Sequence, residues 1–75
     1  MQLIEYVQAY DSNVERAVEI GVAEFRRLNG EVPNVVLVSP GDIGHLNGST
    51  GAMRVVKNGL SRESGNVIVG ILTYK

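Results

Sequence analysis

Two segments of this chain carry apolar residues at consecutive positions and lack the alternation of a half-buried strand. Residues 35–38 read Val-Val-Leu-Val, and residues 67–74 read Val-Ile-Val-Gly-Ile-Leu-Thr-Tyr. Both are rich in β-branched residues, which favour strands. Successive side chains of a strand point to opposite faces of its sheet. The sequence therefore predicts two strands whose faces both need cover from water.

One long helix is the largest predicted element that could cover a face of these strands. Apolar residues recur at spacings of three and four from Val14 to Leu28, which is the pattern of one apolar helix stripe. The Ser-x-x-Glu pattern at 12–15 is typical of a helix start with Ser12 as the capping residue. The Asn-Gly pair at 29–30 is typical of a helix end. We predict a helix over residues 13–29, about 25 Å long at 1.5 Å per residue, which can cover one face of a small sheet.

The segment before this helix allows two interpretations. Its Ile, Tyr and Val content predicts a strand over residues 2–9. Leu3, Ile4, Val7 and Tyr10 also continue the helical spacing backwards, so an additional helix is the alternative.

Three further elements follow the strand at 35–38. Residues 40–47 predict a short helix with Ser39 as its cap, Asp42 in its first turn and Ile43 and Leu46 directed inward. The two glycines inside this segment lower its helix propensity, so a loop is the alternative. Residues 52–57 have the mixed polarity of a less buried strand, and the Asn-Gly pair at 58–59 favours a tight reversal after it.

These elements predict one small α+β domain spanning residues 1–75. Their order is β-α-β-(short α)-β-β, with one main helix packed on a small mixed sheet. A helical N-terminal segment would change the order to α-α-β-β-β. A chain of 75 residues has no room for a second domain of usual size.

The composition excludes several classes of site. The chain has no cysteine and a single histidine, so thiol chemistry and cysteine-ligated metals are excluded, and we expect neither a metal nor a cofactor. Seven basic and eight acidic residues give a net charge of −1, and this balance makes nucleic acid an unexpected partner. No apolar segment is long enough to span a bilayer and no secretory leader is apparent, which favours a cytoplasmic protein without a membrane partner.

The apolar strands predict self-association. The predicted helix covers one face of the sheet, and residues 40–47 are at best a partial cover for the other. An apolar face left open on a small protein is typical of an interface. We therefore expect a homo-oligomer, most simply a dimer, or another protein partner; a monomer whose own hairpin wraps round the sheet is the alternative. The strand residues assigned to this interface are Val36, Val38, Val67, Val69 and Ile71.

The glycine-rich segment 39–51 is the candidate ligand site. It follows a strand, and glycines let backbone N–H groups approach an anion closely. It matches neither the dinucleotide fingerprint nor the phosphate-binding loop. Its candidate ligand-binding residues are Ser39, Gly41, Asp42, His45, Gly48, Ser49 and Thr50.

The sequence thus favours a non-enzymatic interaction or structural module that self-associates through an apolar sheet face or edge. A protein that binds a small anion or a nucleotide through residues 39–51 is the second hypothesis. A small enzyme that uses Asp42 and His45 as a carboxylate–imidazole pair is the third, and no catalytic residue is assigned, because spacing alone does not make a catalytic site.

Overall fold

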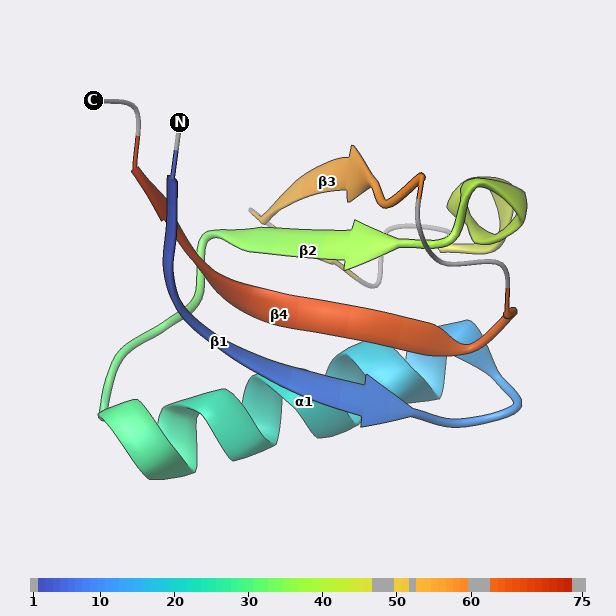
Figure 1. Cartoon of the computed structure of the whole chain (residues 1–75). Helices are drawn as coiled ribbons and strands as arrows, with labels where there is room; N and C mark the ends of the chain where they lie inside the picture. Colours follow the sequence, from blue (N-terminus) through green and yellow to red (C-terminus); the bar gives the residue numbers. More distant parts are fainter. Residues whose placement is uncertain (1, 47–49, 52, 60–62, 74–75) are drawn as a thin grey trace.

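The structure, a computed structural model, describes residues 2–46, 50–51, 53–59 and 63–73. It confirms the α+β fold class and the predicted order of elements (Figure 1). The strands and helices are β1 (Gln2–Tyr10), α1 (Val14–Asn29), β2 (Val35–Val38), the 3-10 helix η1 (Pro40–His45), β3 (Arg54–Lys57) and β4 (Asn66–Thr73).

The four strands form one mixed sheet in the order β1-β4-β2-β3. β4 is antiparallel to β1 and β2, whereas β3 is parallel to β2 (Figure 1). The two strands with apolar residues at consecutive positions are therefore the two central ones, where both faces are shielded most. The reversal predicted at 58–59 does not pair β3 with β4, because β4 lies between β1 and β2 instead.

The N-terminal segment is a strand, so the helical alternative is wrong. β1 pairs along its length with β4, with a bulge between Leu3 and Glu5. Tyr6 lies opposite Gly70, and a Cβ at position 70 would meet the Glu5 carbonyl oxygen at 2.2 Å. This close approach of β1 to β4 requires glycine at position 70. Pairing with β4 keeps residues 2–10 extended, although their apolar residues also have helical spacing.

Helix α1 begins one residue later than its sequence pattern predicts. Its cap is Asn13, not Ser12: the Asn13 side-chain oxygen accepts hydrogen bonds from the backbone N–H groups of Glu15 and Arg16, at 3.0 and 3.4 Å. The helix ends as predicted, with Gly30 in the left-handed region at φ 67° and its N–H bonded to the Arg26 carbonyl.

The short helix predicted at 40–47 is the 3-10 helix η1. Ser39 precedes it but makes no side-chain capping bond. Leu46 is buried as predicted, whereas Ile43 is exposed at 37%. η1 contacts α1, and Leu46 joins the same core cluster as Phe25. η1 thus lies on the same face of the sheet as α1 and does not cover the opposite face.

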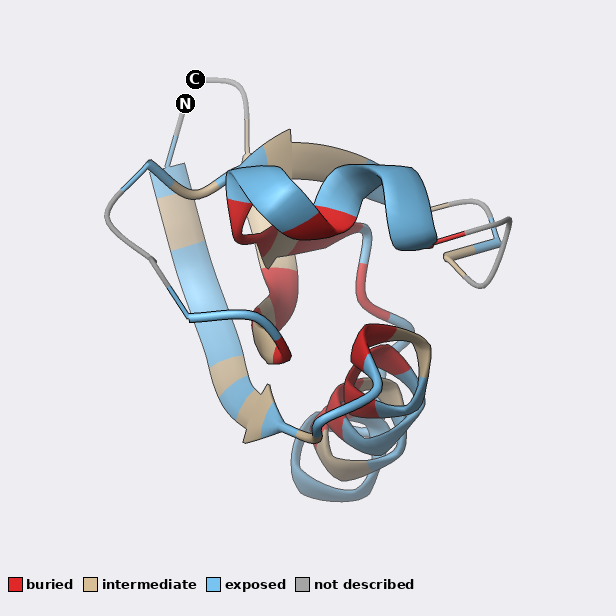
Figure 2. Cartoon of the chain, turned by 90° about the vertical axis from the view of Figure 1, so that its right-hand side faces the viewer, coloured by how far each residue is buried: buried red, intermediate tan, exposed pale blue. Residues whose placement is uncertain are grey.

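The core lies between the sheet, α1 and η1, whose buried residues form one cluster. Figure 2 shows these residues on the sides of the ribbons that are nearest to one another. Helix α1 lies along β1 and β4. Gly21 allows this packing, because a Cβ there would stand 2.7 Å from a Val69 methyl group. Val69 pairs with Val7 and Val36, so these three residues share the covered face.

The alternate residues of the strands face away from α1, and we call their surface the open face. The register places Ile68 opposite Leu37, Leu37 opposite Val56, and Leu72 opposite Leu3. No helix of the described residues lies on this side of the sheet. By register, the large apolar residues of the open face are Leu3, Tyr6, Tyr10, Val35, Leu37, Val56, Ile68 and Leu72. Val35 among them is buried.

Candidate functional site

Asp42 is the most deeply buried polar residue among the described residues of the candidate ligand segment 39–51. It lies in η1 and is only 3% exposed. One carboxylate oxygen accepts a hydrogen bond from the Ser64 hydroxyl at 2.7 Å, and the other accepts one from the Gly65 N–H at 2.8 Å. The Asp42 side chain therefore does not cap η1, the role that its place in the first turn suggests. Its hydrogen bonds connect η1 to the turn that leads into β4.

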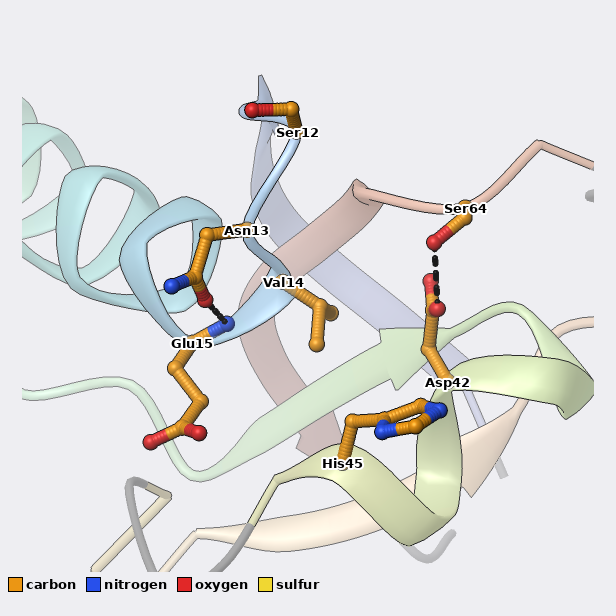
Figure 3. A pocket seen from close by; sticks show the side chains of 7 residues that line it. All are labelled: Ser12, Asn13, Val14, Glu15, Asp42, His45 and Ser64. Atoms are coloured by element: carbon orange, nitrogen blue, oxygen red, sulfur yellow. Dashed lines mark hydrogen bonds between the residues drawn. The ribbon is translucent and has the colours of Figure 1, made fainter.

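A shallow depression of about 410 Å³ lies beside this contact. Its wall contains the start of α1, with Asn13 and Glu15, and the side chains of Asp42, His45 and Ser64 (Figure 3). The side-chain oxygen of Asn13 already bonds the first turn of α1, and both oxygens of Asp42 already bond the 64–65 turn. Asn13, Asp42 and Ser64 therefore use their side-chain oxygens in hydrogen bonds within the fold.

The carboxylate–imidazole pair of the enzyme hypothesis is close in space but is not joined. His45 is exposed and lies beside Asp42 in the wall of the depression (Figure 3). No hydrogen bond joins the two side chains among the described residues, because the Asp42 oxygens accept from Ser64 and Gly65. A general base needs a partner that orients its ring, and this arrangement does not supply one from Asp42.

The other residues predicted for a ligand do not gather in the depression. Ser39 is buried ahead of η1, and Gly41 is exposed with open space where a Cβ would stand. Gly48 and Ser49 lie outside the described residues. Thr50 lies elsewhere, in the wall of a second cavity. The structure therefore brings together Asp42 and His45 from the predicted set and separates Thr50 from them.

That second cavity is an apolar groove of about 630 Å³ beside α1. It is open to solvent at Val32, which is largely exposed. The sequence analysis did not predict this groove, because its two sides come from segments about 30 residues apart. The principal residues of its wall are Val18, Val22, Val32, Pro33, Thr50 and Met53.

The five residues assigned to a self-association interface lie on the covered face. Val36, Val38, Val67 and Val69 are buried in the core, and Ile71 packs against it. Their side chains contact the α1 side of the molecule and are not available to a second copy. The predicted interface residues are therefore on the wrong face of the sheet. The open face is formed by the alternate residues of the same strands, such as Leu37 and Ile68.

The open face is apolar and lacks acidic side chains among its described residues. Tyr6 is more than half exposed, while Leu37, Val56 and Ile68 are partly exposed. Arg54 lies at its margin on the edge strand β3. Sequence periodicity contains the signal for this set in β2, β3 and β4, whose members occupy every second position, but in β1 the bulge between Leu3 and Glu5 breaks the alternation. Periodicity alone also does not say which set the helix covers.

Charge on the described surface is locally paired on α1. Arg27 donates hydrogen bonds to both carboxylate oxygens of Glu24. These hydrogen bonds lower the pKa of Glu24 and raise the pKa of Arg27. Arg27 is exposed and Glu24 is partly exposed, so the two charges neutralise each other on the surface without forming a buried site.

Two other kinds of site are absent from the described part of the chain. No group of three or more His, Asp or Glu side chains stands close enough there to hold a metal ion. No helix in the same residues is long and apolar enough to cross a membrane.

Comparison with known proteins identifies no protein that is similar to this chain. No protein-family model matches the sequence, no curated protein is significantly similar to it, and no solved structure matches its fold. Function must therefore be argued from the geometry of this chain.

Proposed function

We propose that this protein is a non-enzymatic structural or interaction module that self-associates through the open face of its sheet. The observation that carries the proposal is the one-sided cover of the sheet. Both helical elements lie on one face, and the described residues of the other face are mainly apolar. An apolar face of this kind on a small protein is typical of an interface.

The charge of the face favours a second copy as the partner. The molecule measures 27 × 25 × 19 Å along its principal axes. A typical stable interface buries roughly 800 Å² on each partner, so a second copy would have to cover the whole open face and not only its centre. Because the face lacks acidic side chains and has Arg54 only at its margin, two copies related by a two-fold axis bring few like charges together.

The test is the mass of the protein in solution after a charge is placed on the open face. We expect sedimentation or light scattering to give at least twice the chain mass for the unmodified protein. Ile68→Lys places an ammonium group in the centre of the apolar face, so it should weaken association at least tenfold. Val56→Lys on the edge strand β3 is a second variant in case Ile68→Lys lowers stability.

Ile43→Lys is the matched control, since it makes the same substitution at an exposed residue of η1, on the other side of the sheet. It should leave the mass unchanged. A monomeric unmodified protein at high concentration would overturn the proposal. So would an oligomer that both Ile68→Lys and Val56→Lys leave intact.

The anion-binding hypothesis stays a prediction that no observation favours. The polar groups of Asp42 and Asn13 are used within the fold, and Gly48 and Ser49 lie outside the described residues.

A further inference from the structure

Strand β1 is a long edge of the sheet with little protection against pairing. It has nine residues, and in the described chain only β4 pairs with it. None of its residues is buried (Figure 2), and Ile4, Tyr6 and Tyr10 are each more than half exposed. Glu5 is its single charged residue. A long apolar edge strand of this kind readily accepts another strand.

The other edge of the sheet has the usual protection. β3 has four residues, and charged Arg54 and Lys57 stand at its two ends. Short edges and charged side chains discourage pairing. The two edges therefore differ, and β1 is the edge that can more readily pair with a further strand.

The hydrogen-bond pattern shows which backbone groups of β1 point outward. The Asp11 N–H donates to the Gly65 carbonyl at 3.2 Å, which continues the β1–β4 register by one residue. In an antiparallel pair, every second residue bonds its neighbour and the residues between them point the other way. The backbone N–H and C=O groups of Tyr6, Gln8 and Tyr10 are thus directed away from β4.

We propose that β1 pairs with β1 of a second copy, antiparallel and about a two-fold axis perpendicular to the sheet. This inference rests on the proposed function and adds a second contact to it. The pairing joins two four-stranded sheets into one sheet of eight strands and gives the outward backbone groups of Tyr6 and Gln8 partners. It also makes the open faces of the two copies continuous.

Side-chain charge selects the position of the axis. A two-fold axis at Gln8 would place Glu5 opposite Asp11 of the second copy, and like charges directly opposite each other destabilise a sheet. An axis at Val7 places Glu5 opposite Ala9 and Tyr6 opposite Gln8. Charge therefore favours the axis at Val7 over the axis at Gln8.

The position of α1 argues for a second copy over an unrelated strand. α1 contacts both β1 and β4, so it lies near the β1 edge of the sheet. Pairing of two β1 strands would therefore bring the two α1 helices to neighbouring positions across the two-fold axis, where helices can pack against each other. A foreign strand would bring no such helix.

The flank of α1 beside β1 carries suitable side chains. Val18 and Val22 line the groove on the other flank, and Ile20 lies about 160–200° from each of them around the helix. Ile20 is 44% exposed, and packing two α1 helices together would bury it. Glu24 and Arg27 are already paired on this helix, so the helix–helix contact brings no net charge from them.

Together with the open-face contact, the edge contact predicts an assembly of four copies with two kinds of two-fold axis. Gln8→Pro removes an outward N–H without removing a hydrogen bond to β4, since proline is tolerated on a sheet edge. We expect it to convert four copies into two, measured by light scattering. Gln8→Ala keeps the N–H and is the matched control, which should leave four copies.

Ile20→Lys tests the same contact without changing the backbone, and Ile43→Lys is again its control. The edge contact predicts that Ile20→Lys also gives two copies, while its circular dichroism spectrum stays that of the unmodified protein. If the protein self-associates but Gln8→Pro and Ile20→Lys both leave its mass unchanged, the edge contact is wrong and the open-face proposal stands. If the unmodified protein is monomeric, both proposals fail.

Discussion

At the scale of single residues, Asp42 illustrates how a candidate catalytic group can be a structural one. Its position after a strand and near the single histidine suggested chemistry or capping. In the structure its two oxygens instead bond Ser64 and Gly65, 22 and 23 residues further along the chain. Gly65 adopts φ 88°, a backbone conformation that glycine adopts without strain, and Asp42 bonds the N–H of this turn.

We predict that Asp42→Ala lowers the free energy of unfolding by about 2–3 kcal/mol. The substitution removes two hydrogen bonds to a buried acidic side chain and leaves the buried Gly65 N–H without this acceptor. Urea denaturation at fixed protein concentration measures the change. His45→Ala, at an exposed position in the same depression, should change the free energy by less than about 0.5 kcal/mol. Equal stability of the two variants would show that the Asp42 contacts do not hold the turn.

At the scale of secondary structure elements, α1 shows how far local patterns reach. The apolar stripe and the Asn-Gly end were predicted correctly, and the capping residue was wrong by one position. Ser12 and Asn13 are both good capping residues, so local propensity does not separate them. Asp11 helps to decide, because its side-chain oxygen accepts a hydrogen bond from the Asn13 N–H at 2.9 Å and orders the chain just before the helix.

We predict that Asn13→Ala destabilises the protein by about 1 kcal/mol, the usual effect of losing a capping residue. Ser12→Ala, one residue earlier, should have an effect near zero, since the Ser12 side chain is exposed and does not cap α1. Thermal unfolding of the two variants, followed by circular dichroism, measures both effects. A larger loss for Ser12→Ala than for Asn13→Ala would contradict the assignment of the cap.

The sheet shows a second limit of local patterns. The two strands with apolar residues at consecutive positions, β2 and β4, are central in the sheet, and β3, with its mixed polarity, is at an edge. The Asn-Gly signal at 58–59 nevertheless suggested a hairpin that does not form between β3 and β4. Strand order depends on which pairing buries the most apolar surface over the whole sheet, and the most apolar strand, β4, is buried best between two neighbours.

At the scale of the whole molecule, the protein has a well-filled core on one side of its sheet and an open face on the other. The two proposed contacts would cover the open face and the β1 edge, which are both exposed to solvent in a single chain. If folding is coupled to association, then stability depends on protein concentration through mass action.

We therefore predict that the melting temperature of the unmodified protein rises by about 3–5 °C for each tenfold increase in concentration. The double variant Ile68→Lys with Gln8→Pro, which should be monomeric, is expected to melt at a temperature independent of concentration. Calorimetry over a hundredfold range of concentration makes the comparison. A constant melting temperature for the unmodified protein would exclude coupling between folding and association.

The sequence by itself determined the kinds of elements, their order and the need to cover both faces of β2 and β4, because these follow from spacings within a few residues. Only the tertiary structure decided that α1 and η1 share one face, that Val36 and Val69 are core while Leu37 and Ile68 form the open face, and that Asp42 bonds the 64–65 turn. Those features depend on which distant segments meet. A strand with two apolar faces has no local pattern that tells which face its helix will cover.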